Sequence, residues 1–327
     1  MKEKVLITGA SGFLGFHLIE AALEKNLDVY AGIRKSSDIK HLSHLPISFI
    51  NLDLSNLNNL TEIISKNQYD YIIHAAGITK AKTQIHYNVV NADYTYNLAL
   101  AVKHSGIALK KFIFISSLAA LGPLENIEGI INESTKPSPV TDYGRSKLLS
   151  EIKLQQLPMP LVILRPTAIY GPREKDLFLL FKFVKRGYEM YIGKVSQRLS
   201  FVYAKDMADV TINALDNPNN GSYNISDGNS YNRYDFAKYL KLIMKKKTIK
   251  FYLPYSLVKL IGITLEKIGD LFNKTPVINE DKLNEITGRN WVCSIEKAKN
   301  ELNFKPLFNL ETGLVKTLQW YKKFNWL

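Results

Sequence analysis

The sequence predicts an α/β protein in which a doubly wound parallel sheet is followed by a smaller, mostly helical region. Short apolar runs alternate with segments that carry apolar residues at helical spacing throughout the first half of the chain. The apolar runs are nearly continuous, which is typical of parallel strands covered on both faces. Repeated β-α units of this kind build a doubly wound sheet through right-handed crossovers. Beyond residue 166 this alternation loosens and helical patterns dominate.

The expected elements follow one another in order along the chain. The strand segments are rich in β-branched and aromatic residues and are expected at 4–8, 27–33, 48–51, 71–75, 112–116 and 221–226. The helical segments carry apolar residues three and four apart and are expected at 13–25, 57–66, 87–104, 176–186, 204–215, 253–272, 280–286 and 310–320. The long segment 253–272 is expected to pack on the core. A lid over an apolar substrate, or an interfacial helix, is the alternative for this segment.

Composition narrows the class of protein. The 327 residues are 46% hydrophobic and 22% charged, which excludes a disordered chain. The single cysteine, Cys293, cannot form an internal disulfide, and no run of ~18 uncharged apolar residues is present to span a membrane. The start of the chain lacks the apolar stretch of a signal peptide, so a cytoplasmic location is expected. No metal site is expected.

The chain carries a formal net charge of +13, from 43 Lys and Arg against 30 Asp and Glu. An acidic partner such as nucleic acid or a membrane would use this excess. Compositional drift is the preferred interpretation, because only Lys245–Lys247 forms a basic run. Nucleic acid is therefore not expected as a partner, and neither is stable insertion into a membrane.

A glycine-rich turn lies between the first strand and the first helix. Gly9, Gly12 and Gly15 are spaced so that the turn is tight, backbone can approach a pyrophosphate, and helix and strand pack closely. Backbone N–H groups between Ser11 and Gly15, Phe13 and Leu14 among them, would meet the phosphates at the positive end of the helix dipole. The strand–turn–helix context favours dinucleotide binding over a plain structural turn.

The choice of cofactor depends on the end of the second strand. The sequence there has Arg34, Lys35 and two serines in place of the acidic residue that holds the ribose 2′-hydroxyl of NAD. An Arg at this position can hold a 2′-phosphate, so NADP is the expected cofactor, otherwise NAD. Arg34 stacking on adenine in either cofactor is the alternative. Asp53, after the third strand, is expected to accept a hydrogen bond from the adenine or to form a turn.

A candidate catalytic group follows in the same half of the chain. Tyr143 and Lys147 are four residues apart and share one face of a helix. A nearby ammonium and a cationic nicotinamide both favour the phenolate and lower the pKa of a tyrosine. Ser116 and Ser117, at the end of a strand, offer a hydroxyl for a substrate carbonyl. Each motif is common alone, but the combination after a dinucleotide turn is specific.

Together these motifs resemble the extended short-chain dehydrogenase/reductase family, the NAD(P)-dependent epimerase/dehydratase group, over nearly the whole chain. The resemblance implies Ser117, Tyr143 and Lys147 as catalytic residues, with Asn91 supporting a proton relay. It adds to the cofactor contacts Leu54, Ala75, Ala76, Gly77 and Pro166. Ser116, His74 and Arg165 are expected to brace the fold, and Cys293 to be inert.

The family resemblance also divides the chain and suggests its activity. Residues 1–170 form a dinucleotide-binding Rossmann domain, to which the chain returns around 198–216, and residues 171–327 form the main substrate-binding region. The implied reaction is hydride transfer between nicotinamide and a secondary alcohol or ketone. A nucleotide-sugar epimerase or dehydratase with a tightly held cofactor, and a non-catalytic NADP-binding sensor, are the alternatives. Family members often form homodimers, here through segments 87–104 and 141–156.

The substrate region departs from nucleotide-sugar epimerases. These enzymes typically carry an Arg two residues before the aromatic of the Phe-Val-Tyr strand, where this sequence has Leu199, with Arg198 one residue early. A shift of one residue turns a strand side chain to the opposite face. The segment is closer to the 3β-hydroxysteroid dehydrogenase and dihydroflavonol reductase branches. The expected contacts of the small-molecule substrate are Thr79, Arg173, Asp176 and Arg198.

Overall fold

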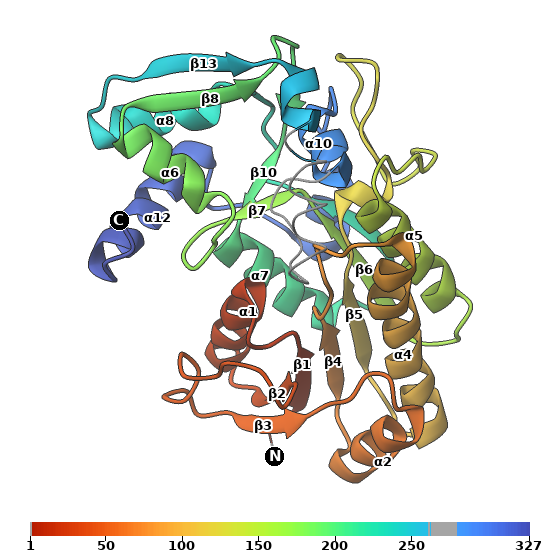
Figure 1. Cartoon of the computed structure of the whole chain (residues 1–327). Helices are drawn as coiled ribbons and strands as arrows, with labels where there is room; N and C mark the ends of the chain where they lie inside the picture. The colour runs from red at the N-terminus through yellow and green to blue at the C-terminus, as the bar shows by residue number, and fades with distance from the viewer. Residues whose placement is uncertain (1, 261, 263–279) are drawn as a thin grey trace.

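A computed structural model describes residues 2–260, 262 and 280–327. Its centre is a seven-stranded parallel sheet with the order β11-β6-β5-β4-β1-β2-β3, which confirms the predicted fold class (Figure 1). Six of these strands lie close to their predicted positions, and β6, which ends in Arg165 and Pro166, was not predicted as a strand. The bounds are β1 Lys4–Thr8, β2 Asp28–Ile33, β3 Ser48–Asn51, β4 Tyr71–His74, β5 Lys111–Ile115, β6 Leu161–Pro166 and β11 Gly221–Ile225.

Both faces of the sheet are covered by helices, which explains its continuous apolar strands. On one face Val5 and Ile7 pack in a core with residues of α1 (Phe13–Glu24) and α7 (Ala204–Asn213). On the other face Leu6 packs with residues of α2 (Leu57–Asn67), α4 (Tyr94–Ser105) and α5 (Asp142–Gln155). The alternation of neighbouring strand residues between two cores follows from the two-residue period of a strand.

The helix expected over 87–104 is divided in three. Helix α3 spans Gln84–Tyr87, a π-helical stretch η1 spans Asn88–Asp93, and α4 continues from Tyr94. A π-helical turn widens the helix and often marks a functional site, and this one contains Asn91. The turn buries Asn91 completely against α5.

The second part of the chain forms a cap with its own aromatic core. It contains three two-stranded sheets besides helices: β7 with β10, β9 with β12, and β8 with β13. The strand bounds are β7 Ala168–Tyr170, β8 Tyr188–Ile192, β9 Arg198–Leu199, β10 Phe201–Tyr203, β12 Tyr231–Asn232 and β13 Ile249–Leu253. The helices are α6 Phe178–Lys185, α8 Asp235–Met244, α10 Glu280–Thr287, α11 Glu296–Leu302 and α12 Leu310–Lys323.

Several sequence predictions differ from the cap in detail. Strand β13 ends at Leu253, where the long helix was expected to begin. Residues 255–260 are helical, and residues 261 and 263–272 of that prediction lie outside the described residues. Helix α7 packs on α1 and so returns to the sheet, and α11 packs on β11. None of the helices that the structure describes is long and apolar enough to cross a membrane.

Candidate functional site

The glycine turn between β1 and α1 is as tight as its sequence predicts. Gly9 has a φ of +69°, and a Cβ placed on it would lie 2.7 Å from the Ala75 carbonyl carbon. A Cβ on Gly15 would lie 2.2 Å from the Gly9 carbonyl oxygen. Among the described residues no side chain caps α1 at Gly12, so its first N–H groups, on Phe13 and Leu14, are available to an anion. The turn therefore fits a pyrophosphate, as does the partly exposed Ser11 beside it.

The end of β2 presents exposed cations. Arg34 and Lys35 are both exposed, and neither side chain forms an ion pair among the described residues. A short turn holds the backbone: the Arg34 N–H donates to Ser37 Oγ at 3.1 Å, and the Ser37 N–H donates to the Arg34 carbonyl at 2.9 Å. The guanidinium is thus free to meet a phosphate.

Asp53 and Leu54 follow β3. One oxygen of Asp53, Oδ1, accepts hydrogen bonds from the backbone and hydroxyl of Ser55 at 3.0 and 2.5 Å. These hydrogen bonds lower the pKa of the carboxyl below its usual range. Asp53 therefore forms a turn, while its Oδ2 has no hydrogen bond within the described chain. Leu54 is partly buried against the core below.

The segment after β4 is fixed by a buried chain of hydrogen bonds. The Thr8 hydroxyl lies 2.7 Å from His74 Nδ1 and accepts a hydrogen bond from the Ala76 N–H at 3.2 Å. His74 Nε2 lies 2.8 Å from the Thr95 hydroxyl. Burial, with the charge of Lys147, lowers the pKa of His74 to about 3, so this ring is neutral and braces the fold. Ala75 and Ala76 are thereby held beside the glycine turn.

Asn91 connects this segment to α5. Its Oδ1 accepts a hydrogen bond from the Ile78 N–H at 2.8 Å, and its Nδ2 donates to the Ile78 carbonyl at 3.0 Å and to Ser146 Oγ at 2.9 Å. A Cβ on Gly77 would lie 3.0 Å from Asn91 Oδ1 and 3.5 Å from Lys147 Nζ. Asn91 therefore positions the loop after β4, since its side-chain donors and acceptor already have partners.

Tyr143, Ser117 and Lys147 meet at the carboxyl ends of β4 and β5. The Ser117 hydroxyl lies near enough to Tyr143 to interact with its phenol. Burial and the charge of Glu285 raise the pKa of Tyr143 above its usual value, and the interaction with Ser117 partly offsets this. The Lys147 ammonium donates to the Ile115 carbonyl at 2.8 Å and lies 4.7 Å from the centre of the Phe114 ring. Burial lowers the pKa of Lys147 to about 8, against the opposing charge of Glu151.

Ser116 faces away from this group and joins a buried ion pair. Its hydroxyl donates to Glu151 Oε1 at 2.5 Å. Arg165 Nε lies 3.0 Å from Glu151 Oε1, and its Nη2 lies 2.6 Å from Oε2. The exposed fractions of Glu151 and Arg165 are 1% and 6%, so the pair is shielded from water. Glu151 was missed from the sequence, although its place four residues after Lys147 puts both on one helix face.

Glu285 was also missed, and no local pattern could have found it. It belongs to α10, far from Tyr143 in sequence, and lies near enough to affect the phenol electrostatically. Its carboxylate lies 2.8 Å from Lys282 Nζ. Only the tertiary fold brings this acid beside the proposed proton donor.

The expected substrate residues lie at different places around the site. Thr79 is exposed, and its carbonyl accepts a hydrogen bond from the Tyr87 hydroxyl at 3.2 Å. Lys80 Nζ lies 2.8 Å from Asp176 Oδ1 and joins the loop after β4 to the cap. Arg173 has a φ of +75°, and its guanidinium lies 3.8 Å from the centre of the Phe16 ring. Pro166 ends β6 and is buried.

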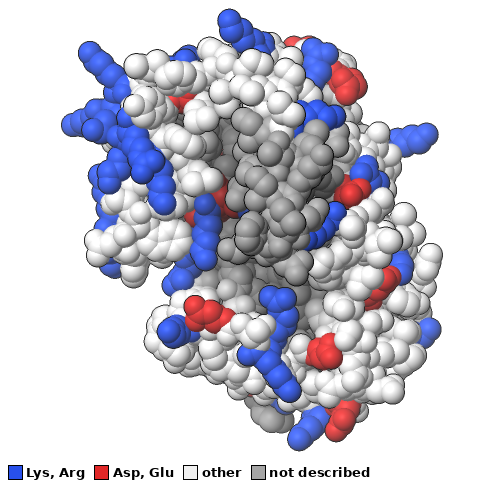
Figure 2. Space-filling view, in the orientation of Figure 1, with Lys and Arg blue, Asp and Glu red and all other residues white. Residues whose placement is uncertain are grey.

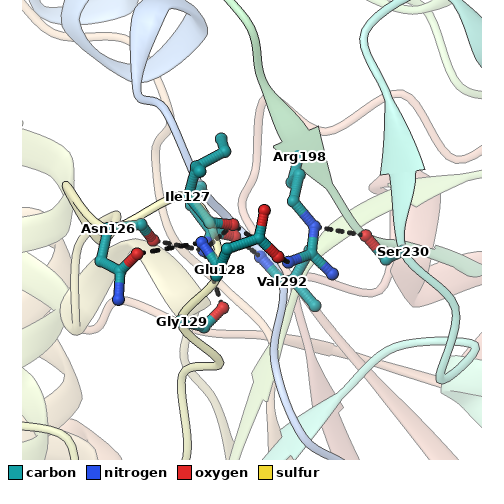
Figure 3. A network of polar contacts seen from close by, with 8 residues as sticks. Asn126, Ile127, Glu128, Gly129, Arg198, Ser230 and Val292 are labelled. Atoms are coloured by element: carbon teal, nitrogen blue, oxygen red, sulfur yellow. Dashed lines mark hydrogen bonds and ion pairs between the residues drawn. The ribbon is translucent and has the colours of Figure 1, made fainter.

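Arg198 forms part of a structural junction (Figure 3). Its Nε donates to Ser230 Oγ at 3.0 Å, and its Nη1 donates to the Ile127 carbonyl at 3.0 Å. Asn290 completes the junction, because its Nδ2 donates to the carbonyls of Asn126 and Gly129, both at 2.8 Å. Leu199 packs partly buried against the aromatic core of the cap. The guanidinium of Arg198 is therefore already bound to two segments of the protein, the loop at 127–128 and Ser230.

The doubly wound sheet, the glycine turn and the Ser-Tyr-Lys group define an enzyme of the extended short-chain dehydrogenase/reductase class. Comparison with known proteins supports this class. The sequence profile of the NAD dependent epimerase/dehydratase family matches residues 5–226. The chain belongs to this family.

Individual relatives span nearly the whole chain. The UDP-glucose 4-epimerase of Vibrio cholerae is 28% identical over 99% of this chain and 97% of its own length. The ceramide reductase of Caulobacter vibrioides is 26% identical over 99% of this chain and 96% of its own length. Among solved structures, the Thermotoga maritima UDP-glucose 4-epimerase with UDP-glucose superposes with a TM-score of 0.81 at 21% identity, covering 98% of this chain and 99% of the other. The names of these proteins give different substrates, so similarity alone does not identify the substrate of this chain.

Proposed function

We propose that the protein is an oxidoreductase that transfers hydride between a nicotinamide cofactor and a secondary alcohol or ketone of a small molecule. The observation that carries this proposal is the placement of the Ser117 and Tyr143 hydroxyls near each other, beside the buried Lys147 ammonium. A hydroxyl pair next to a cation can hold a carbonyl oxygen and exchange its proton. The nicotinamide supplies the hydride chemistry when it is bound.

The chain fits this cofactor at both ends of the nucleotide. The glycine turn leaves backbone N–H groups for a pyrophosphate, and no side chain of the described residues caps them. Gly77 keeps the space beside Lys147 open, since a larger residue there would crowd Asn91 and Lys147. Lys147, Ala75 and Ala76 would hold the nicotinamide half, and Phe13, Leu14 and Gly15 the phosphates.

The protonated form of Tyr143 is the form that can donate a proton to a ketone oxygen. Because burial and Glu285 raise its pKa, the phenol keeps its proton at neutral pH and is ready to donate it. Ser117 would orient the ketone oxygen, Tyr143 would protonate it, and the Lys147 ammonium would stabilise the phenolate that remains. Asn91 would act as a positioning residue, because it fixes the loop on which Gly77 lies.

NADP is the cofactor we propose, with NAD as the alternative. The proposal is supported by the exposed Arg34 guanidinium and the nearby Ser37 hydroxyl, which follow β2 and could bind a 2′-phosphate of the adenosine ribose. A planar guanidinium binds phosphate in a bidentate manner, and no acidic residue at the end of β2 would repel it.

A nucleotide-sugar epimerase is the second candidate, since two of the similar proteins carry that activity in their names. In an epimerase, the same residues would oxidise and then reduce the sugar without release of the cofactor. The cap supports this candidate less well. Leu199 occupies the position expected for a diphosphate-gripping Arg, and Arg198 is bound by Ser230 and Ile127.

One experiment separates these candidates. The purified protein is incubated with NADPH and a panel of apolar ketones, and separately with UDP-glucose, while nicotinamide absorbance and sugar products are followed. Net oxidation of NADPH by a ketone supports the oxidoreductase. Conversion of UDP-glucose without net change in nicotinamide would establish the epimerase in its place.

A further inference from the structure

The cap carries an exposed apolar surface on the two strands β8 and β13. The strands are parallel, and Ile249 pairs with Tyr188 while Phe251 pairs with Met190. These four side chains point away from the cap and are 42–63% exposed. We call this surface the β8–β13 face. Contiguous exposed apolar groups of this kind mark a place where something binds.

The opposite side of the same two strands is packed, which fixes the orientation of the β8–β13 face. Glu189 is 3% exposed, and its Oε1 lies 2.7 Å from Lys241 Nζ of α8. Tyr191 packs edge-on against Tyr234, with ring centres 4.8 Å apart. Because strand side chains alternate, these inward contacts hold Tyr188, Met190, Ile249 and Phe251 outward.

Parallel pairing also brings two basic segments together. Lys185 and Arg186 directly precede β8, and Lys245–Lys247 directly precede β13, so all five cations lie at the same end of the strands. Gly187 connects the two ends, since its carbonyl accepts a hydrogen bond from the Ile249 N–H at 2.9 Å. All five side chains are exposed, and none forms an ion pair within the described part of the chain.

The charge of the whole protein is concentrated here. In the stretches 178–194 and 231–253, Lys and Arg number eleven, against the acidic residues Glu189 and Asp235. This difference of nine makes up most of the net charge of +13. Figure 2 shows Lys and Arg gathered on the side of the molecule where α6, α8, β8 and β13 lie in Figure 1. The excess charge is therefore a local feature of the cap rather than an even drift in composition.

We propose that the β8–β13 face docks the protein on an anionic lipid bilayer, with the apolar groups at the headgroup boundary and the five cations on lipid phosphates. An apolar centre beside a cluster of cations is the arrangement that peripheral binding to such a surface requires. The aliphatic Ile249 and Met190 have no use in stacking nucleic-acid bases. The Tyr188 and Phe251 rings are inclined at 58° rather than forming a flat platform. These features favour lipid over single-stranded RNA.

Vesicle sedimentation of the full-length protein tests this surface directly. The probes are phosphatidylcholine vesicles with and without about one-third phosphatidylglycerol, at about 0.1 M and about 1 M salt. We expect binding only to the anionic vesicles and only at the lower salt. Equal binding to neutral vesicles, or no binding to anionic ones, would overturn the proposal.

Variants identify the residues responsible. Lys245→Gln/Lys246→Gln/Lys247→Gln is expected to weaken binding on the order of 100-fold, since each cation near an anionic surface contributes about fivefold. The matched control is Lys66→Gln/Lys103→Gln/Lys136→Gln, which removes the same charge from exposed lysines outside the cap and should retain most of the binding. An equal loss in both variants would reduce the effect to net charge and refute a defined face.

A fluorescent label tests the depth of the apolar groups without relying on a destabilised variant. Phe251→Cys is labelled with an environment-sensitive dye, because the native Cys293 is only 4% exposed. We expect a blue shift with anionic vesicles, and none for the same dye at Glu62→Cys on α2, at the opposite end of the molecule (Figure 1). An unshifted dye at 251 would contradict the proposal. A single-stranded RNA that displaces the vesicles and shifts the dye would identify the face as a nucleic-acid site instead.

Discussion

The buried Glu151–Arg165 pair leads to a prediction about the free energy of unfolding. Glu151→Gln removes the carboxylate that compensates a guanidinium only 6% exposed. Arg165 Nη1 already has no hydrogen-bond partner among the described residues, so no second group takes over the charge. Breaking a buried pair from one side costs about 3–5 kcal/mol. The amide oxygen of Gln can still accept hydrogen bonds from Ser116 Oγ and Arg165 Nε, but its NH2 group cannot accept from Arg165 Nη2. We therefore expect at least about 3 kcal/mol.

Urea unfolding followed by circular dichroism measures this loss. The matched control is Glu128→Gln, which removes the carboxylate that faces Arg198, where Glu128 is 82% exposed, and should cost less than about 1 kcal/mol. The apolar exchange Glu151→Leu/Arg165→Met should recover most of the loss, since no buried charge remains. A cost below about 1 kcal/mol for Glu151→Gln would refute the electrostatic reasoning.

Three further predictions concern the cofactor and the lysine. Gly15→Ala places a Cβ 2.2 Å from the Gly9 carbonyl oxygen, so NADPH affinity in calorimetry should fall about 10- to 100-fold; unchanged affinity would contradict the close-approach argument. Arg34→Gln should weaken NADPH by about tenfold or more and leave NADH nearly unchanged; an equal effect on both would indicate adenine stacking. Lys147 has a folded pKa of about 8, below its unfolded value, so the unfolded chain binds the extra proton between about pH 8 and 10.5. Stability should therefore rise with pH in this window by about 3 kcal/mol relative to Lys147→Met, and parallel pH profiles of the two proteins would refute the shift.

The first half of the fold could be predicted from the sequence because its signals are local. The strand at 4–8 and the helix after it are encoded by a continuous apolar run, a glycine turn and helical spacing. The π-helical turn at Asn88–Asp93 was not predicted, and Asn91 within it bonds to Ile78 and Ser146, which are not its neighbours in sequence.

Much of the cap was missed because its strands are short and pair over long distances. Strand β8 shows an alternating burial pattern that its sequence could have suggested, but its partner β13 follows some sixty residues later. Helix α8 has apolar residues at helical spacing and could have been identified. The exposed apolar face on β8 and β13 became visible only once both strands were placed together.

The residues of the candidate site also fall into those that the sequence could predict and those that it could not. Gly9, Tyr143 and Lys147 were predictable because each belongs to a motif of fixed local spacing, and the structure brings Ser117 to Tyr143. Glu285 was not predictable, since its effect on Tyr143 depends on how α10 docks. The charge of +13 had no clear meaning in the sequence, because its concentration in the cap depends on which basic segments the strands bring together.

The central claim is that Tyr143 exchanges the proton during hydride transfer. Single-turnover oxidation of bound NADPH by an accepted ketone, measured for the wild type and for Tyr143→Phe, tests it most directly. Because Phe lacks only the hydroxyl, NADPH affinity should stay nearly unchanged while the transfer rate falls on the order of 1,000-fold. A transfer rate within about threefold of the wild type would contradict this role for Tyr143.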